Sequence, residues 1–299
     1  MERAGTTYYD RAAGRLETER VYAGASLDWL YNSRAGAAVL PGLVGGPAFS
    51  RLWGWAHRRR FSRRWIRPFV ERMGVDASES LRPLEDFESF SDFFVRAIHP
   101  SRRPVRPEPG VCIAPADGKV LAYPVVDARA SFRIKRSTFD LGGLLRDEAT
   151  AGLFAGGSMV VSRLSLADCH HFHFPDSGTP GEARSIAGLY HAGGPYARRR
   201  LVPFFTENHR MVTRLESDHF GPVAQVEVGA LTVGSVRQRY RPGVRAAKGQ
   251  AKGVFELGGS SVVLLFRRGA IVLDPDLCAR TTDEVETYVR MGESIGRAR

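Results

Sequence analysis

The sequence contains few cysteines, and their spacing excludes two common kinds of stabilising framework. Only Cys112, Cys169 and Cys278 occur among the 299 residues, and no two of them form a Cys-x-x-Cys pair. Such spacing offers neither a set of disulfides nor a zinc-binding signature. We therefore expect a protein of a reducing compartment, and the cysteines give no reason to expect a metal.

Long apolar runs are also absent, so the sequence predicts no segment that spans a membrane. The longest apolar stretch, residues 35–49, has about 15 residues and is interrupted by Pro41 and Pro47, whereas a spanning helix needs about 20. The first residues are not followed by the apolar core of a secretory signal. Any association with a membrane is therefore expected to be peripheral.

Acidic residues are outnumbered by basic ones, and the excess is concentrated in one region. The chain has 43 Lys and Arg against 32 Asp and Glu, which gives a formal net charge of +11. Eight arginines lie between Arg51 and Arg72. Aromatic residues are interleaved with them: Trp53, Trp55, Phe61, Trp65 and Phe69. A chain of this charge is suited to anionic partners such as lipid headgroups or nucleic acid.

Three interpretations of this basic, aromatic region are compatible with the sequence. It can be a helix docked on the body with a solvated basic face, a contact with a lipid surface, or a nucleic-acid site. Tryptophan settles at membrane–water interfaces, and arginine there binds phosphate groups. No nucleic-acid fold signature accompanies the arginines, so we expect no nucleic-acid partner. The first two interpretations both stay open on these residues alone.

The distribution of apolar residues and prolines predicts an α+β protein made of two regions. Residues 1–100 are expected to be helical, because phenylalanines recur at three- and four-residue spacing from Phe87 onward. Four prolines between Pro100 and Pro109 then form a stiff connection. Residues 101–299 are expected to form a β-rich, mostly antiparallel body.

Short apolar runs separated by glycine, proline and aspartate mark the expected strands of this body. They are residues 120–126, 158–164, 183–190, 211–215, 223–228, 231–236, 261–266 and 270–273. One short helix is expected at residues 141–148. The spacing of the runs favours antiparallel pairing with long loops.

Three histidines within four residues form the first candidate site. His170, His171 and His173 precede Pro175, which ends the segment. On a strand, His171 and His173 would share a face and His170 would point away. Imidazoles at such a junction suit acid–base catalysis, metal binding or a structural role. No second pair of ligands completes a metal site, but all three roles stay open on this segment alone.

Two further segments carry groups that could act together with an imidazole. Asp117 lies in the Pro-Ala-Asp-Gly turn of residues 115–118, and Gly259-Ser260 opens an apolar run. Taken singly, each segment is typical of an ordinary turn. Taken with the histidines, they supply a carboxylate, a base and a serine beside a glycine carbonyl. Those are the groups needed to activate a hydroxyl against a backbone carbonyl.

In their order and spacing, these segments resemble those of the phosphatidylserine decarboxylases, a pyruvoyl-dependent family of phospholipid biosynthesis. The shared patterns are Pro-x-Asp-Gly at 115–118, His-x-x-His-x-Pro at 170–175 and Gly-Ser-Ser at 259–261. Weaker similarities occur at 93–96, 206–210, 228–230 and 248–249, and residues 8–11 are similar to a bacterial branch of the family. The resemblance extends over residues 8–290.

The resemblance implies that the chain is a zymogen that cuts itself between Gly259 and Ser260. Asp117 is expected to orient and charge His173, and His173 is expected to take the proton from the Ser260 hydroxyl. Ser260 is thereby converted into a covalent pyruvoyl group, which is the cofactor. The products are a β chain of residues 1–259 and an α chain of residues 260–299, which stay associated.

The resemblance also implies the activity, that of a carboxy-lyase. The pyruvoyl group would form a Schiff base with phosphatidylserine, and loss of carbon dioxide would give phosphatidylethanolamine. His170 is expected to return a proton to the substrate or to hold its carboxylate. The implied partners are phosphatidylserine, an anionic membrane surface and a second copy of the chain. We expect a peripheral protein on the cytoplasmic side of the cell membrane.

Some residues depart from the family pattern, and two other functions are compatible with parts of the sequence. Many members carry Arg in place of His171, an aromatic residue in place of Cys169 and Thr in place of Ser261. None of these changes removes a group that the chemistry needs. The alternatives are a metal-dependent hydrolase built on the histidines and a catalytically silent lipid-binding homologue. The complete set of Asp, His and Ser argues against the silent homologue.

Overall fold

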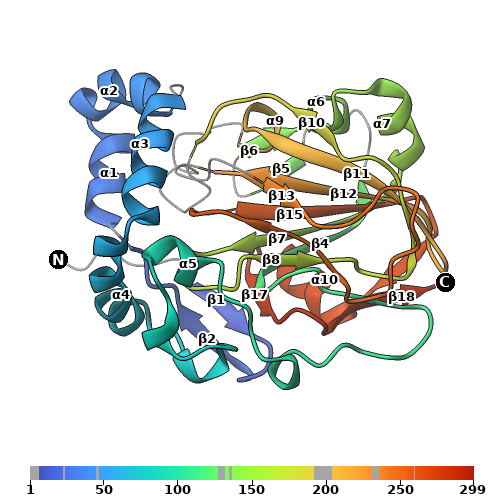
Figure 1. The fold of residues 1–299 in the computed structure, drawn as a ribbon. Coiled ribbons are helices and arrows are strands. Elements are labelled where there is room, and N and C mark those ends of the chain that lie inside the picture. The colour runs from blue at the N-terminus through green and yellow to red at the C-terminus, as the bar shows by residue number, and fades with distance from the viewer. Residues whose placement is uncertain are drawn as a thin grey trace.

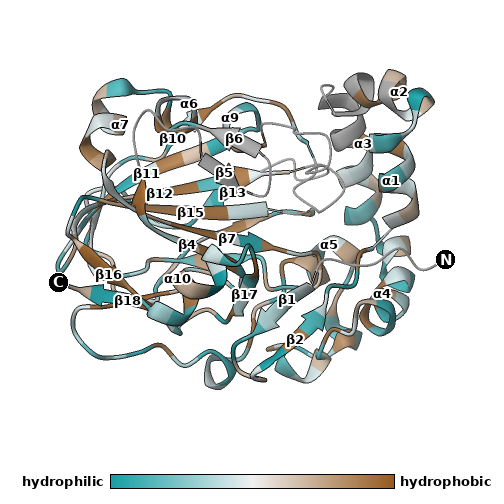
Figure 2. Cartoon of the chain, turned by 180° about the vertical axis from the view of Figure 1, so that it is seen from behind, coloured by the Kyte–Doolittle hydropathy of each residue, from teal (hydrophilic) through white to brown (hydrophobic). Residues whose placement is uncertain are grey.

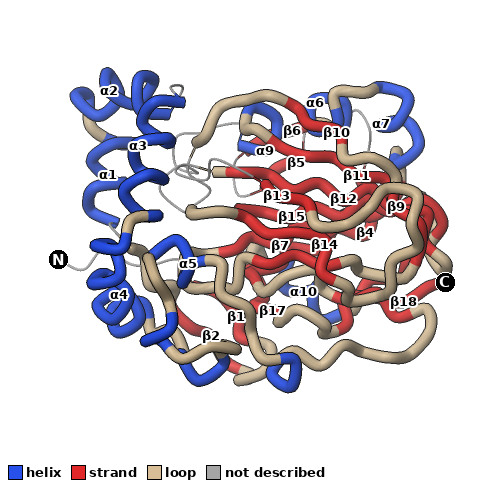
Figure 3. The backbone as a smooth tube through the Cα atoms, viewed as in Figure 1, coloured by secondary structure: helices blue, strands red, loops and turns tan. Residues whose placement is uncertain are grey.

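A computed structural model describes residues 7–22, 24–44, 47–126, 132–134, 137–191, 204–230, 236–258 and 260–299. A β-rich body makes up most of the molecule, and a group of helices stands along one edge of it (Figures 1 and 3). The antiparallel body and the separate helices confirm the α+β prediction.

One sheet of ten strands forms the centre of the body. Its order is β10-β11-β12-β15-β7-β4-β17-β1-β2, and β9 pairs with β11. The strands are β1 (Thr7–Asp10), β2 (Arg15–Thr18), β4 (Gly118–Val126), β7 (Gly157–Leu164), β9 (Gly178–Pro180), β10 (Arg184–Ile186), β11 (Arg210–Ser217), β12 (Gly221–Gly229), β15 (Ser260–Phe266) and β17 (Glu286–Val289). The central strands β7 and β15 are buried along their whole length. Much of β12 and β15 is hydrophobic (Figure 2).

Smaller sheets and short helices complete the body. One sheet has the order β13-β14-β8, and another has the order β16-β18-β3. Their bounds are β3 (Val111–Ile113), β8 (His171–His173), β13 (Val236–Gln238), β14 (Ala251–Phe255), β16 (Ile271–Leu273) and β18 (Ser294–Ala298). The remaining elements are the pair β5 (Phe132–Ile134) and β6 (Ser137–Phe139), with helices α6 (Leu141–Leu145), α7 (Glu148–Phe154), α9 (Phe204–Glu207) and α10 (Pro275–Thr282). The chain between β14 and β15 therefore passes from a small sheet to the centre of the large one.

The helices along the edge come from residues 24–102. They are α1 (Gly24–Asn32), α2 (Arg34–Val44), α3 (Pro47–Arg58), η1 (Arg60–Trp65), α4 (Ile66–Met73), η2 (Ala77–Glu79), η3 (Leu84–Asp86), α5 (Phe90–Phe94) and η4 (Pro100–Arg102). Buried aromatic rings hold them together, and Phe69 meets Phe90 edge-on at 5.1 Å. Leu257, which lies between β14 and β15, packs in the same cluster. The helical edge is thus anchored directly beside the start of β15.

The beginning of the chain differs from the prediction that residues 1–100 are helical. Strands β1 and β2 form a hairpin, and β1 pairs in parallel with β17 near the C-terminus. The buried Arg163 side chain joins this region to the sheet, because it binds both Glu19 and Glu286. Isolated hairpins are marginally stable. The pairing of β1 with β17 therefore stabilises the strand conformation of this short polar segment.

Most of the expected strands are present with small shifts at their ends. The strand expected at 183–190 is shorter, and the helix expected at 141–148 is divided into α6 and α7. The division falls at Arg146, which has left-handed backbone geometry with φ of 48°. Residues 231–235 of one further expected strand lie outside the described residues. No helix in the described ranges is long and apolar enough to cross a membrane.

Candidate active site

The histidine segment lies in the small sheet next to the start of β15. Strand β8 pairs with β14, which leads into β15 after four residues. His171 and His173 are partly exposed and flank the fully buried Phe172, so they alternate with it as the sequence predicts. Phe172 packs in one cluster with Val262 of β15 and Ala116 of the Pro-Ala-Asp-Gly turn. The three predicted segments therefore meet at one place.

His173 is held as a neutral base by the Pro-Ala-Asp-Gly turn. Its backbone N–H donates to the Pro115 carbonyl at 2.7 Å, and its Nδ1 lies 3.2 Å from the same oxygen. A carbonyl only accepts hydrogen bonds, so Nδ1 carries the proton and Nε2 is left with a lone pair. Burial lowers the pKa of His173 to about 4. The ring is therefore uncharged at neutral pH and can accept a proton.

His170 is fully buried beside the turn that precedes β15. Its Nδ1 lies 2.9 Å from the Asp168 carbonyl, and its ring packs on Phe94 at 4.1 Å. Burial lowers the pKa of His170 to about 4, although the charge of Asp168 partly opposes this effect. Its Nε2 has no hydrogen-bond partner among the described residues. His170 thus presents a second neutral imidazole at this turn.

Ser260 begins β15 at the centre of the large sheet. It pairs with Gly229 of β12 on one side and with Leu164 of β7 on the other. Its side chain is 1% exposed, and its Oγ has no partner in the described part of the chain. A buried, unpaired hydroxyl is costly and calls for an explanation, of which a role in a reaction is one.

The backbone just before Ser260 is strained. Leu257 has φ of 23° and Gly258 has φ of 121°, and both values lie in the left-handed region that residues with a side chain avoid. Strain of this kind is found at reactive sites when the surroundings hold the backbone in place. Leu257 is so held, because it is buried in the aromatic cluster. Gly259, the predicted cleavage residue, lies outside the described residues.

Asp117 is buried at the site, but its carboxylate has partners that the sequence analysis missed. Arg103 Nε donates to it at 2.8 Å, and the backbone N–H of Met291 donates to it at 2.8 Å. Among the described contacts no hydrogen bond joins Asp117 to His173, so the orientation of His173 by Asp117 stays a prediction. The guanidinium of Arg103 binds the carboxylate because the two groups can form a bidentate ion pair. Asp117 acts on His173 in two indirect ways. It belongs to the turn whose Pro115 carbonyl contacts His173, and its charge slightly opposes the lowering of the His173 pKa.

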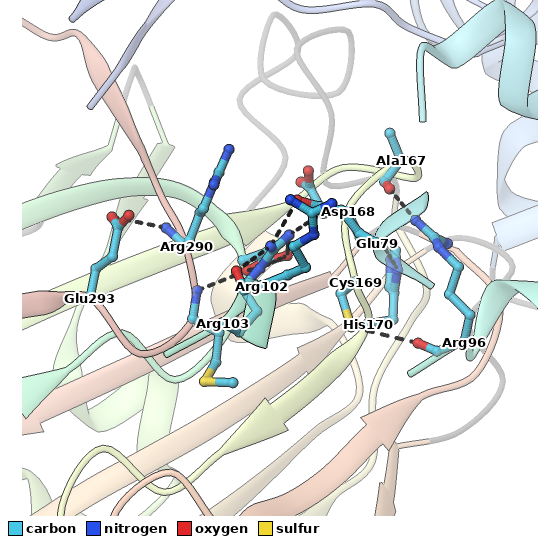
Figure 4. A network of polar contacts seen from close by, with 12 residues as sticks. Glu79, Arg96, Arg102, Arg103, Ala167, Asp168, Cys169, His170, Arg290 and Glu293 are labelled. Carbon is cyan, nitrogen blue, oxygen red and sulfur yellow. Dashed lines mark hydrogen bonds and ion pairs between the residues drawn. The ribbon is translucent and has the colours of Figure 1, made fainter. Parts of the chain in front are cut away.

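Asp117 is among the residues that line a polar cavity of about 350 Å³. Glu79, Arg103, Asp168 and Cys169 are among its lining residues and lie close together (Figure 4). Arg103 also binds Glu79 at 2.8 Å. The proline-rich connection supplies Arg103, and nothing in that segment marks the arginine in the sequence.

The structure offers no support for the metal alternative. Within the described ranges no group of three or more His, Cys, Asp or Glu residues is placed to hold a metal ion. His171 uses its Nε2 to contact the Val95 carbonyl at 2.9 Å, and the other two imidazoles contact backbone carbonyls through Nδ1. The three rings therefore do not converge on a common point through these atoms.

Comparison with known proteins identifies the class. The family model described as phosphatidylserine decarboxylase matches residues 90–297. The phosphatidylserine decarboxylase proenzyme of Chlamydia muridarum is 40% identical over 297 residues, which cover 99% of both chains. The corresponding proenzyme of Desulfitobacterium hafniense is 38% identical over 289 residues, which cover 97% of both chains. The protein is therefore a decarboxylase.

More narrowly, the chain belongs to the phosphatidylserine decarboxylase family. The similarity extends over nearly the whole chain, so it includes the N-terminal hairpin and helices as well as the site.

Proposed function

We propose that this protein decarboxylates phosphatidylserine to phosphatidylethanolamine with a pyruvoyl group that it makes from its own Ser260. One observation carries the proposal: a buried hydroxyl without a partner stands directly after a strained turn. A neutral imidazole with a free Nε2 is available in the adjoining sheet. Ser162 in the neighbouring strand also has a buried, unpaired hydroxyl, so the strained turn and the nearby base are what distinguish Ser260.

Cleavage begins with the Ser260 hydroxyl. His173 Nε2 takes the proton from Oγ, and Oγ attacks the carbonyl carbon of Gly259. The carbon–nitrogen bond of the peptide then breaks, the amino nitrogen takes up a proton, and an ester joins the two residues. The strained turn favours this step, since release of backbone strain lowers the barrier.

Elimination completes the cut. Loss of the α-proton of Ser260 breaks the bond between Cβ and Oγ, which frees a carboxylate on Gly259 and leaves dehydroalanine. Addition of water and loss of ammonia then give the pyruvoyl group at the N-terminus of residues 260–299. Strand β15 would hold this group in place between β12 and β7.

In the decarboxylation, the pyruvoyl group supplies an electron-accepting carbonyl to the substrate amine. The chain supplies positioning and a proton. His170 lies at the same turn, its Nε2 is unpaired, and its burial keeps water away. Its Nε2 carries a lone pair, so we assign to it the transfer of a proton: it takes the proton that the substrate ammonium gives up and returns it to the substrate carbon that loses carbon dioxide. Asp117 is a positioning residue, because with Arg103 it fixes the turn that holds His173.

The two chains stay together after cleavage because the N-terminal hairpin forms hydrogen bonds and ion pairs with the α chain. Arg11 donates to Asp274, to Asp276 and to the Ser294 carbonyl, and all three lie after the cut. The Arg163–Glu286 ion pair also joins the two chains. Breaking a buried ion pair of this kind costs about 3–5 kcal/mol.

Contact with a membrane belongs to the same proposal. Exposed apolar side chains gather on α1, α3 and η1: Trp29, Leu52, Trp53, Trp55 and Phe61. Arginines flank them, and Arg59 stacks on Trp55 at 4.8 Å. Indole rings anchor at the interface, and each arginine near an anionic surface adds about 1 kcal/mol. We propose peripheral attachment through this edge on the cytoplasmic side.

The double substitution Trp55→Ser with Phe61→Ser should weaken binding to vesicles that contain anionic phospholipid. We expect at least about a fivefold loss of affinity in a vesicle sedimentation assay, because two exposed rings no longer enter the interface. Val272→Ser is the matched control, since Val272 is half exposed in β16, outside the helical edge. Equal binding by the double variant and the wild type would refute this contact.

The rate of self-cleavage should be independent of pH from about 8 down to about 5.5. Burial lowers the pKa of His173 to about 4, so the ring stays neutral over this range and loses its lone pair only below it. The rate is measured on freshly translated chain that is moved into buffers of different pH and sampled on denaturing gels. A rate that halves near pH 6.5, the ordinary value for histidine, would show that His173 is not the buried base.

The proposal as a whole is tested with a carbonyl reagent. Phenylhydrazine should abolish the release of carbon dioxide from phosphatidylserine and should label residues 260–299 but not residues 1–259. Unchanged activity with no label on the smaller chain would overturn the pyruvoyl proposal.

A further inference from the structure

Arg96 is a buried cation whose role the proposed chemistry does not explain. It follows α5, and its side chain is only 3% exposed. The guanidinium stacks on Phe93 at 4.7 Å, and Nη2 donates to the Ala167 carbonyl at 2.6 Å. The remaining nitrogens, Nε and Nη1, are buried and have no partner in the described part of the chain.

The other buried cations at the cavity are neutralised. Arg103 is paired with Glu79 and Asp117, and Lys119 is paired with Asp168. No ion pair involving Arg96 is found among the described residues. Arg96 nevertheless lines the same cavity, so it brings two unused hydrogen-bond donors to its wall.

Arg96 also lies beside the reaction centre. Its backbone carbonyl accepts a hydrogen bond from the Cys169 thiol, the residue next to His170 (Figure 4). The Phe93 ring on which it stacks shares a buried cluster with Leu257, which precedes the cleavage turn. The cavity wall also includes Asp168 and Cys169, the two residues before His170, and the charge of Arg96 helps to lower the pKa of His170.

A buried guanidinium with unused donors is costly unless an anion binds to it. The geometry points to Arg96 as the residue that binds the phosphodiester of the substrate headgroup, through Nε and Nη1. This inference rests on the proposed function, and it adds a binding contact to it. The cavity of about 350 Å³ is within the range of small-molecule sites.

The substrate headgroup carries two anions, and the chemistry favours the phosphodiester. The carboxylate loses its charge as carbon dioxide leaves, so an arginine on it would stabilise the ground state more than the transition state. The phosphodiester keeps its charge throughout. A contact with it stabilises substrate and transition state equally, which lowers KM and leaves kcat unchanged.

The test compares Arg96→Met with the wild type in three measurements. Self-cleavage should be complete, kcat should be unchanged, and KM for phosphatidylserine in mixed micelles should rise about 10- to 100-fold, as expected for loss of hydrogen bonds to a charged group. The inhibition constant of glycerophosphoethanolamine should rise by a similar factor, because this probe keeps the phosphodiester and lacks the carboxylate. Arg96→Lys should lie between the two proteins.

Arg82→Met is the matched control, since Arg82 stacks on Phe87 of the same aromatic cluster at 4.3 Å but does not line the cavity. It should behave as the wild type. An unchanged KM for Arg96→Met would overturn the inference. A higher KM with an unchanged inhibition constant would assign Arg96 to the carboxylate and would overturn it too.

The conservative variant Arg96→Lys tests the inference if Arg96→Met fails to undergo self-cleavage. If Arg96→Met stays uncleaved, Arg96→Lys carries the same comparison, and a wild-type KM and inhibition constant for it would overturn the inference. None of these outcomes touches the proposed function, which is tested on the wild-type chain by its cleavage and by its reaction with phenylhydrazine.

Discussion

Replacing Ser260 with alanine is expected to leave a single uncleaved chain that releases no carbon dioxide from phosphatidylserine. The substitution removes the only atom that can attack the preceding carbonyl, so neither the ester nor the pyruvoyl group can form. The fold should be retained, because Oγ has no partner to lose among the described residues and the alanine fits the same strand. Denaturing gels and a carbon dioxide assay measure both effects.

Ser162→Ala provides the matched control. Ser162 lies in β7 opposite Val262 of β15, and its hydroxyl is likewise buried and unpaired in the described structure. The control should be cut and active, since its hydroxyl does not adjoin the cleavage turn. Cleavage of Ser260→Ala at the normal position would remove the basis of the proposed mechanism.

Replacing His173 with glutamine should slow self-cleavage by at least about 100-fold, the usual contribution of a general base. Glutamine can still donate to the Pro115 carbonyl and so preserve the turn, but it offers no basic nitrogen to Ser260. The half-time is read from gels of freshly translated protein. A chain that matures at the wild-type rate would show that another group takes the proton.

His170→Gln separates the two histidines. This variant should be cut, because His173 remains in place, but it should decarboxylate slowly, because the proton donor is missing. The opposite pattern, normal decarboxylation after slow cleavage, would contradict the assignment. It would make His170 the base for cleavage and His173 the residue that returns the proton. His219→Gln is a further control, because His219 is partly exposed and bound to Asp176 outside the predicted motifs.

Local patterns predicted much of the fold. Apolar runs with turn residues at their ends gave strands such as β7, β12 and β15 to within a few residues, because strand formation there follows from burial of the run. The N-terminal hairpin was not predicted, because burial of an apolar run does not account for it. Its strands are only partly buried, and the partner that orders them, β17, lies at the other end of the sequence.

The candidate site was also predicted only in part, because some of its contacts come from residues distant in the sequence. The sequence placed the imidazoles, the Pro-Ala-Asp-Gly turn and the serine together, because a family resemblance relates segments that no local pattern connects. It did not predict that Arg103 binds Asp117, since Arg103 comes from a proline-rich connection that carries no signal of its own. Arg96 stood in a recognisable phenylalanine-rich motif, but only its burial and its unpaired nitrogens indicate a role.

The intact mass of the denatured wild-type protein tests the central claim most directly. We predict two chains, residues 1–259 and residues 260–299, and a smaller chain whose mass is lower than that of a peptide beginning with Ser260 by one molecule of ammonia. A single chain of 33.0 kDa that is fully active on phosphatidylserine would contradict the account.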